Sequence, residues 1–164
     1  MKLRIRRRTL FAATLAALFA ATTFHTQAKE HPMATAHGPF DVKLTALDAY
    51  NRGDASMGRR ALDKQFHGAL EATSQGEMLS VGTARDNGGY VAIERVTGTL
   101  DGRAGSFALQ HNATMTAGVP AMNIVVVPGS GTGALSGISG RMTIEIAAGG
   151  AHSYTLEYAL PPAA

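Results

Sequence analysis

Apolar and polar side chains alternate at every second residue through most of this chain, and that alternation constrains the fold more than any other feature. In the segment 153–160 the even-numbered residues are all Tyr or Leu, while three of the other four are polar. The segments 40–45 and 142–146 follow the same rule, and the run 62–71 carries Leu and Phe on one face. This spacing is typical of half-buried β-strands. The candidate for a helix, 46–60, is interrupted by two glycines, so the sequence predicts an all-β protein.

Short turn sequences that are rich in glycine separate these segments. All 19 glycines follow Ala28, and the Asn-Gly and Asp-Gly pairs supply the positive φ angles that tight hairpins require. Strands joined by hairpins form an antiparallel meander, and closing about eight of them into one small barrel removes the exposed edges. A two-sheet sandwich is the alternative. The expected turns are 74–76, 86–89, 101–102, 118–120, 128–131, 137–140 and 149–150.

The N-terminal 28 residues have the three-part layout of a secretory signal peptide. Five basic residues come first, an uncharged stretch of 15 residues covers 10–24, and small residues occupy positions 26 and 28, where a signal peptidase reads the chain. A membrane span needs about 20 apolar residues, so no stable membrane anchor is expected. The sequence therefore predicts a signal peptide over 1–28, a loose lead-in over 29–37 and a single barrel domain over 38–164.

Export changes the electrostatic character of the chain. Removal of the signal peptide takes away 5 of the 15 basic residues and none of the 12 acidic ones, so the mature domain is mildly acidic. Such a domain lacks the basic surface that binds nucleic acid. Arg7 and Arg8 resemble a twin-arginine export signal, although Arg6 stands where Ser or Thr is usual. We expect a periplasmic or secreted protein, with both export routes open; a homo-oligomer is compatible with the sequence.

The stretch "GSFALQH" (105–111) ends an apolar strand face with a histidine. If 101–102 is a two-residue hairpin loop, Glu94 on the preceding strand lies diagonal to His111, and a four-residue loop would place the two directly opposite. A three-residue loop would instead pair Glu94 with Gln110. We favour the even loops, because they put apolar residues together. Glu94 and His111 are therefore the candidate catalytic residues, either as a proton-transfer or ligand-orienting pair or as a satisfied polar pair in the core.

Other polar residues give weaker signals. A ligand inside the barrel could also meet the candidate binding residues Tyr90, Gln110, His152 and Tyr154, although the tyrosines are equally suited to fill the core. The glycine-rich loop 129–133 lacks the lysine and the helix of a phosphate-binding loop, so we interpret it as a structural loop of the barrel rim.

The remaining acidic residues and the histidines do not indicate a catalytic or metal-binding site. Glu71 and Glu77 flank the expected turn 74–76 and are interpreted as solvated hairpin charges. The histidines form neither a His-x-His nor a His-Glu-x-x-His pattern, and the chain has no cysteine. Disulfides, thiolate metal sites and a cysteine nucleophile are thereby excluded. No cofactor or metal is expected, although zinc ligands gathered from distant strands stay open.

Several motifs occur in the same order as in one bacterial family. The chain resembles the domain of unknown function 3224 family from Phe40 to Leu160. This resemblance implies a small β-barrel similar to allene oxide cyclase, within the calycin-like group, but it does not imply that enzyme's activity and brings no catalytic residue with it. The motifs are "FHGALE" (66–71), "GEMLS" (76–80), "YVAIERVTG" (90–98), "GSFALQH" (105–111) and "VPGSGTG" (127–133).

Three functions from different classes fit these observations. The first is a binding module that holds a small apolar or amphipathic molecule in the barrel. The second is an enzyme of the isomerase, cyclase or hydrolase type that uses the interior Glu94–His111 pair. The third is a structural or interaction protein with a solid core. The state of the barrel interior separates the third function from the other two.

Overall fold

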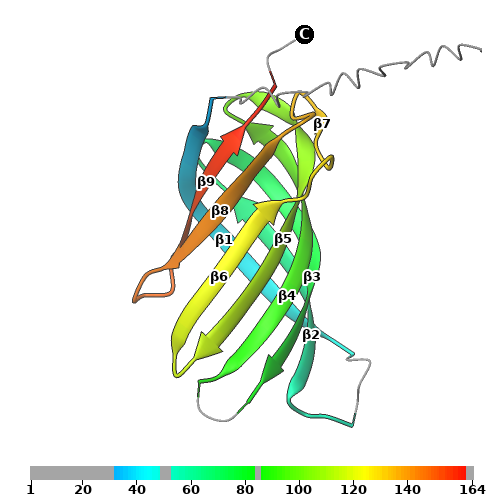
Figure 1. The fold of residues 1–164 in the computed structure, drawn as a ribbon, viewed down its shortest axis with the longest axis vertical. Coiled ribbons are helices and arrows are strands. Elements are labelled where there is room, and N and C mark those ends of the chain that lie inside the picture. The colour runs from blue at the N-terminus through cyan, green and yellow to red at the C-terminus, as the bar shows by residue number, and fades with distance from the viewer. Residues whose placement is uncertain (1–31, 49–52, 84–85, 162–164) are drawn as a thin grey trace, which may run out of the picture.

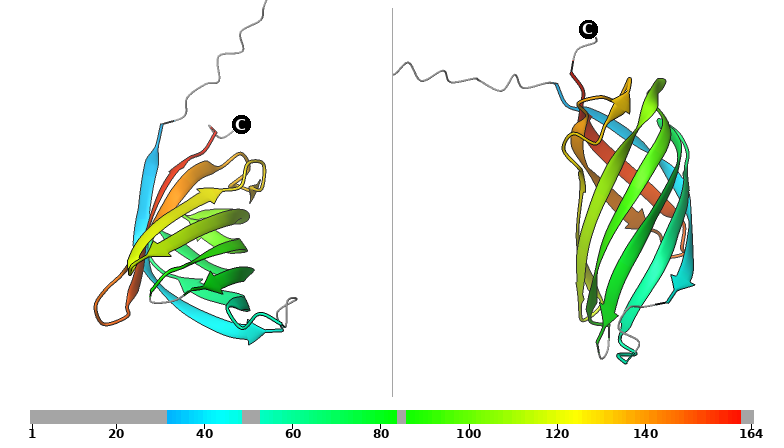
Figure 2. Two further views of the ribbon diagram at one scale, coloured as in Figure 1. Left: turned by 60° about the horizontal axis from the view of Figure 1, so that its bottom comes forward. Right: turned by 90° about the vertical axis from the view of Figure 1, so that its right-hand side faces the viewer.

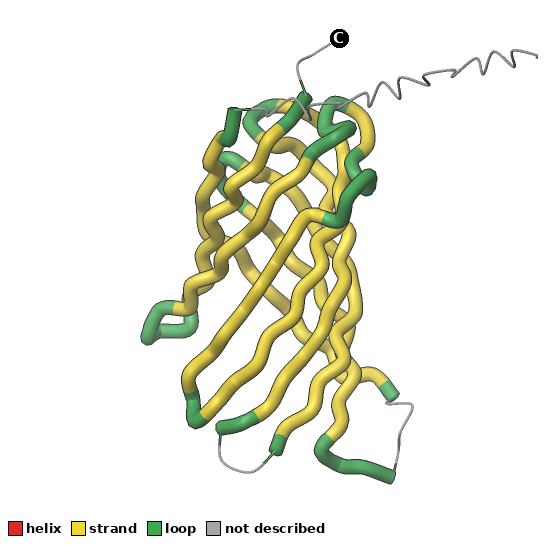
Figure 3. The backbone as a smooth tube through the Cα atoms, in the orientation of Figure 1, coloured by secondary structure: helices red, strands yellow, loops and turns green. Residues whose placement is uncertain are grey.

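The computed structural model describes residues 32–48, 53–83 and 86–161, and strand dominates these ranges (Figure 3). No helix in the described part of the chain is long and apolar enough to cross a membrane. The predicted signal peptide lies outside the described residues, as do residues 49–52 of the helix candidate. The strands are β1 (Ala34–Leu47), β2 (Met57–Phe66), β3 (Leu70–Gly82), β4 (Gly88–Leu100), β5 (Arg103–Thr116), β6 (Val119–Val126), β7 (Thr132–Gly133), β8 (Ser139–Ile146) and β9 (His152–Ala159).

Eight of the strands close into one antiparallel barrel (Figure 1). Strands β1 to β6 follow one another around the wall, β8 pairs with β6, and β9 closes the ring by pairing with β1. The two-residue strand β7 lies outside this ring against the start of β5. The predicted all-β barrel with about eight strands is thus confirmed, and the sandwich alternative is wrong because the wall has no open edge along β1 or β4.

One end of the barrel is packed solid. The rings of Phe66 and Tyr154 meet edge to face with their centroids 5.5 Å apart. The Tyr154 hydroxyl donates to the His67 carbonyl at 3.0 Å and accepts from the Leu70 amide at 2.9 Å, which ties β9 to the β2–β3 connection. Leu135 and Ile138 of the segment 127–138 are buried in the core at this end. The apolar residues buried here include Phe40, Phe66, Leu70, Leu100, Phe107, Leu135, Ile138, Tyr154 and Tyr158.

The opposite end of the barrel, which we call the open end, is not closed all round. Strands β8 and β9 have only 8 residues each, against 13 and 14 for β4 and β5. Only two residue pairs, Ile124 with Met142 and Val125 with Arg141, join β6 to β8. The remainder of β6 pairs with β5 alone, and the β8–β9 hairpin ends part-way along the barrel (Figure 2). Inward side chains of β1 to β6 at this end are consequently exposed or half-buried.

Several predicted boundaries are wrong. Residues 74–76 lie inside β3 rather than in a turn, and the run 62–71 is two strands joined at 67–69. Strand β1 begins at Ala34, inside the predicted lead-in, because Ala34 to Phe40 pair with β9. The helix candidate holds the end of β1 and the start of β2. In all of these places pairing with neighbouring strands outweighs the local preference of the residues.

Other expected local features are found. The loop 129–133 is part of the rim: the Ser130 hydroxyl accepts from the Ala108 amide at 3.0 Å, and its carbonyl accepts from Arg95 at 3.2 Å. Glu71 and Glu77 are exposed, as predicted, but no turn lies between them. Glu77 instead forms an ion pair with Arg59 of β2, with 2.7 Å between Glu77 Oε2 and Arg59 Nη2.

Candidate functional site

Four polar side chains meet inside the barrel, one from each of the neighbouring strands β2 to β5. Glu94 lies at the centre, and its Oε1 accepts hydrogen bonds from Lys64 Nζ and His111 Nε2, each at 2.8 Å. Its Oε2 accepts from Ser74 Oγ at 2.6 Å. All four side chains are buried, and Glu94 is 1% exposed. We call these residues the Glu94 cluster.

The β4–β5 hairpin produces the contact between Glu94 and His111. Leu100 pairs with Arg103, so the loop consists of Asp101 and Gly102 alone, and both take positive φ angles (47° and 75°). In this register Ala92 faces His111, which puts Glu94 and His111 on one face and diagonal to one another. The loop is the shorter of the two even-length loops that the sequence favours, and the predicted contact between Glu94 and His111 is confirmed.

Lys64 and Ser74 were missed by the sequence reasoning. Lys64 lies between Leu62 and Phe66 on the inward face of β2, and that position in the alternation was the available signal. Ser74 was hidden by the turn wrongly placed at 74–76. Both lie one strand apart on the inward face and pair directly across the β2–β3 ladder.

Glycine at position 76 lets β3 lie close to Glu94 of β4. Gly76 pairs directly with Glu94. A Cβ atom added at Gly76 would lie 2.2 Å from the Ile93 carbonyl oxygen and 2.7 Å from the Glu94 Cβ. Any side chain at this position would therefore push β3 and β4 apart at the level of the cluster.

The cluster holds Glu94 as a carboxylate. Burial by itself raises the pKa of Glu94, but the hydrogen bond from His111 and the charge of Lys64 outweigh it and lower the pKa from 4.5 to about 2. The Lys64 ammonium also lies 5.3 Å from the ring centre of Phe40 and 5.7 Å from that of Phe66. Rings at such distances attract a cation electrostatically, so both charges of the pair are stabilised away from water.

The second ring nitrogen of His111 is available for a ligand. An ionised carboxylate only accepts hydrogen bonds, so Nε2 must be the donor to Glu94. Nδ1 has no hydrogen-bond partner among the described residues, and it is not among the fully buried atoms that lack one. Nδ1 accepts a hydrogen bond when the His111 ring is neutral, and it donates one when the ring is an imidazolium. Glu94 thus orients a buried histidine whose second ring nitrogen has no hydrogen-bond partner among the described residues.

The four candidate binding residues lie in different places. Tyr90 is half-buried at an inward position of the open end, where burial and the charge of Glu94 raise the pKa of its hydroxyl. His152 is half-buried, and its ring centre lies 5.1 Å from that of Phe40. Tyr154 belongs to the packed core. Gln110 is exposed on the outward face of β5, so it takes no part in the interior site.

Within the described ranges, no group of three or more His, Asp or Glu side chains is placed to hold a metal ion. Lys64 and Ser74 complete the shell of Glu94, and neither is a common ligand of zinc. The zinc site left open by the sequence therefore has no candidate ligand set in the described part of the chain.

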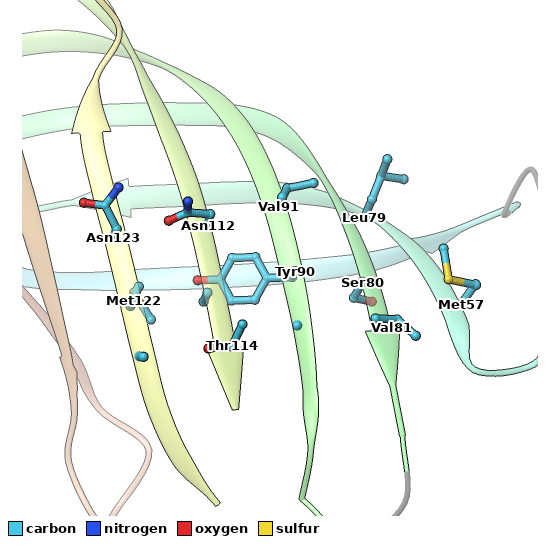
Figure 4. A pocket seen from close by; sticks show the side chains of 13 residues that line it. Met57, Leu79, Ser80, Val81, Tyr90, Val91, Asn112, Thr114, Met122 and Asn123 are labelled. Atoms are coloured by element: carbon cyan, nitrogen blue, oxygen red, sulfur yellow. The ribbon is translucent and has the colours of Figure 1, made fainter. Parts of the chain in front are cut away.

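A groove of about 750 Å³ lies at the open end, over β2 to β6 (Figure 4). Val91 and Asn112 pair across β4 and β5 at outward positions, and Gly89 leaves a gap between their neighbours. The lining also includes Ser80, Tyr90, Ala113 and Met122, which occupy inward positions in the strand alternation, but no residue of the Glu94 cluster. The outward lining residues include Met57, Leu79, Val81, Gly89, Val91, Asn112, Thr114 and Asn123.

Two comparisons place the chain among known proteins. The family model described as a protein of unknown function (DUF3224) matches residues 36–158. A solved structure of a protein with unknown function from the DUF3224 family of Shewanella oneidensis MR-1 is 50% identical, covers 80% of this chain and 100% of its own, and superposes with a TM-score of 0.76. No curated protein matches the chain. The chain therefore belongs to the DUF3224 family, as its motifs predict.

Proposed function

We propose that this protein binds a small apolar or amphipathic molecule against the inner wall of the open end of its barrel. The observation that carries the proposal is a set of inward apolar side chains left in contact with water. The exposed fractions of its exposed members run from 40% at Met122 to 63% at Ile146. A buried ligand would remove this apolar area from water, which favours binding by about 25 cal/mol per Å². The exposed members of the set are Leu44, Met115, Met122 and Ile146, and its half-buried members are Met78 and Ile144.

The Glu94 cluster supplies the polar groups of this proposed site, on the side of the packed core. The Tyr90 hydroxyl is close enough to Glu94 to feel its charge, and His111 offers its free Nδ1. Ligand sites are typically apolar walls with a few placed polar groups, and methionines adapt their shape to different ligands. A solid-core protein fits the packed end of the barrel, but it does not account for exposed apolar residues on an inner wall.

A second candidate is an enzyme in which His111 is the general base. A carboxylate that orients an imidazole with a free second nitrogen has the geometry of a base held by a third group. Glu94 itself is poorly suited to accept a proton, because its pKa is about 2. This candidate uses the same site, so binding of a ligand is common to both functions.

Fluorescence of N-phenyl-1-naphthylamine, a neutral apolar probe, tests the proposed binding. We expect enhancement with the mature protein and its loss in Met122→Asp. The matched control is Ile93→Asp, which places the same charge at an exposed outward position, 58% exposed, and should leave the probe bound. Equal loss in both variants, or no enhancement with the wild-type protein, would refute the proposal.

Native mass spectrometry of protein purified from its own host separates the two candidates. A binding module carries the same molecule in the wild type and in His111→Gln. An enzyme carries a converted molecule in the wild type and an unconverted one in the variant. We further propose export of the mature domain, which is consistent with a site for a small molecule outside the cytosol.

A further inference from the structure

An arginine that has no partner among the described residues lies on the inner wall of the open end. Arg60 pairs across the ladder with Met78, Met78 with Ala92, and Ala92 with His111, so all four residues are on the inward face. Arg60 is exposed, and it makes no hydrogen bond or ion pair with another described residue. Its neighbour Arg59 is on the outward face and is paired with Glu77 at 2.7 Å. Of these two arginines, the inward one can therefore bind a ligand without first breaking an ion pair.

The guanidinium of Arg60 and a serine hydroxyl border the same small space. A Cβ atom added at Gly58 would lie 2.8 Å from Ser80 Oγ and 4.0 Å from Arg60 Nη1. Ser80 pairs directly with Gly58 across β2 and β3. Because Gly58 has no side chain, the wall is recessed between two hydrogen-bond donors.

Lys64 and Glu94 neutralise one another through a contact of 2.8 Å. Arg60 adds a positive charge to the inner wall of the open end, and it forms no ion pair with a described residue. A guanidinium binds a carboxylate with two parallel hydrogen bonds, and such charge-assisted bonds are among the stronger ones in proteins.

We propose that the ligand of the open end carries a carboxylate, which Arg60 binds with the help of Ser80, while its apolar part lies against Met78, Met115 and Met122. This inference rests on the proposed function and adds the chemical class of the ligand. It predicts discrimination between a carboxylate and a neutral molecule with the same apolar chain.

Displacement of N-phenyl-1-naphthylamine by decanoate and by decanol tests the inference. We expect Arg60→Gln to reduce the affinity for decanoate at least about tenfold and to change that for decanol less than about twofold. Arg59→Gln is the matched control and should alter neither affinity. Arg60→Lys keeps the charge and should restore part of the preference for decanoate. Thermal unfolding of Arg60→Gln should match the wild type, because the side chain is exposed and unpaired.

The outcomes separate the two proposals. If decanol and the probe bind but Arg60→Gln does not weaken decanoate, the carboxylate inference is refuted and the proposed binding stands. The inference is also refuted if Arg59→Gln weakens decanoate as much as Arg60→Gln does. If neither the probe nor decanol binds, the proposed function fails, and the inference fails with it.

Discussion

Acid should weaken this protein through Glu94, and the loss can be isolated with one substitution. The pKa of Glu94 is about 2 in the folded protein against an ordinary value of 4.5. Because one pKa unit corresponds to about 1.4 kcal/mol, the ionised carboxylate adds about 3 kcal/mol to the free energy of unfolding. A lowered folded-state pKa means that this contribution is fully present above pH ~4.5 and is lost as the pH falls to ~2.

Urea unfolding of the wild type and of Glu94→Gln, repeated from pH 7 to pH 2, measures this contribution. At pH 7 we expect the variant to be about 3–5 kcal/mol less stable, because it leaves Lys64 buried without its counter-charge. The difference between the two proteins should stay constant down to pH ~4.5 and then shrink by about 3 kcal/mol. Subtraction removes the titration of carboxylates that both proteins share.

Two further variants make the result decisive. Glu77→Gln breaks an exposed pair with Arg59, so it should cost less than about 1 kcal/mol and leave the pH dependence unchanged. If Glu94→Gln does not fold, the double variant Lys64→Met, Glu94→Gln removes both charges and should recover much of the stability. A wild-type protein that loses no more stability than this double variant between pH 4.5 and pH 2 would refute the reasoning.

Four other outcomes are expected. Glu94→Gln and His111→Ala should be non-additive by about 0.5–3 kcal/mol in a double-mutant cycle of thermal unfolding, because the residues touch; additive effects would contradict the contact. Gly76→Val should prevent or strongly weaken folding by circular dichroism, since its Cβ would meet the β4 backbone. Deletion from residue 153 onward should abolish cooperative unfolding, because β9 closes the barrel. The intact mass of exported protein should show cleavage after Ala28, and a retained N-terminus would exclude it.

The β4–β5 hairpin shows what could be predicted from the sequence. Asp101 and Gly102 form a turn that local geometry dictates, and a strand period of two then decides which side chains share a face. The Glu94–His111 contact follows from these two facts alone. The open end does not, because it depends on where β8 and β9 stop and on how few pairs join β6 to β8. No local pattern specifies the height at which a barrel wall ends.

The 74–76 segment shows why the complete cluster was missed. Ser, Gln and Gly in succession favour a turn, but here the glycine serves close packing of two strands, which is a property of the neighbours and not of the segment. With the turn misplaced, Ser74 was removed from the inward face. Leu160 was also expected in the last strand, yet β9 ends at Ala159 and Leu160 packs against the core just beyond it.

Lys64 could have been found by the argument that paired Glu94 with His111. A charge at an inward position of a strand must be neutralised or reach water, because burying it alone is too costly. On β2, Lys64 and Arg60 satisfy that rule in different ways. Lys64 is buried, and its charge is neutralised by Glu94. Arg60 lies four residues nearer the open end, and its charge is in contact with water because the side chain is exposed. The same rule that explains the buried pair therefore leaves Arg60 in contact with water, without an ion pair to a described residue.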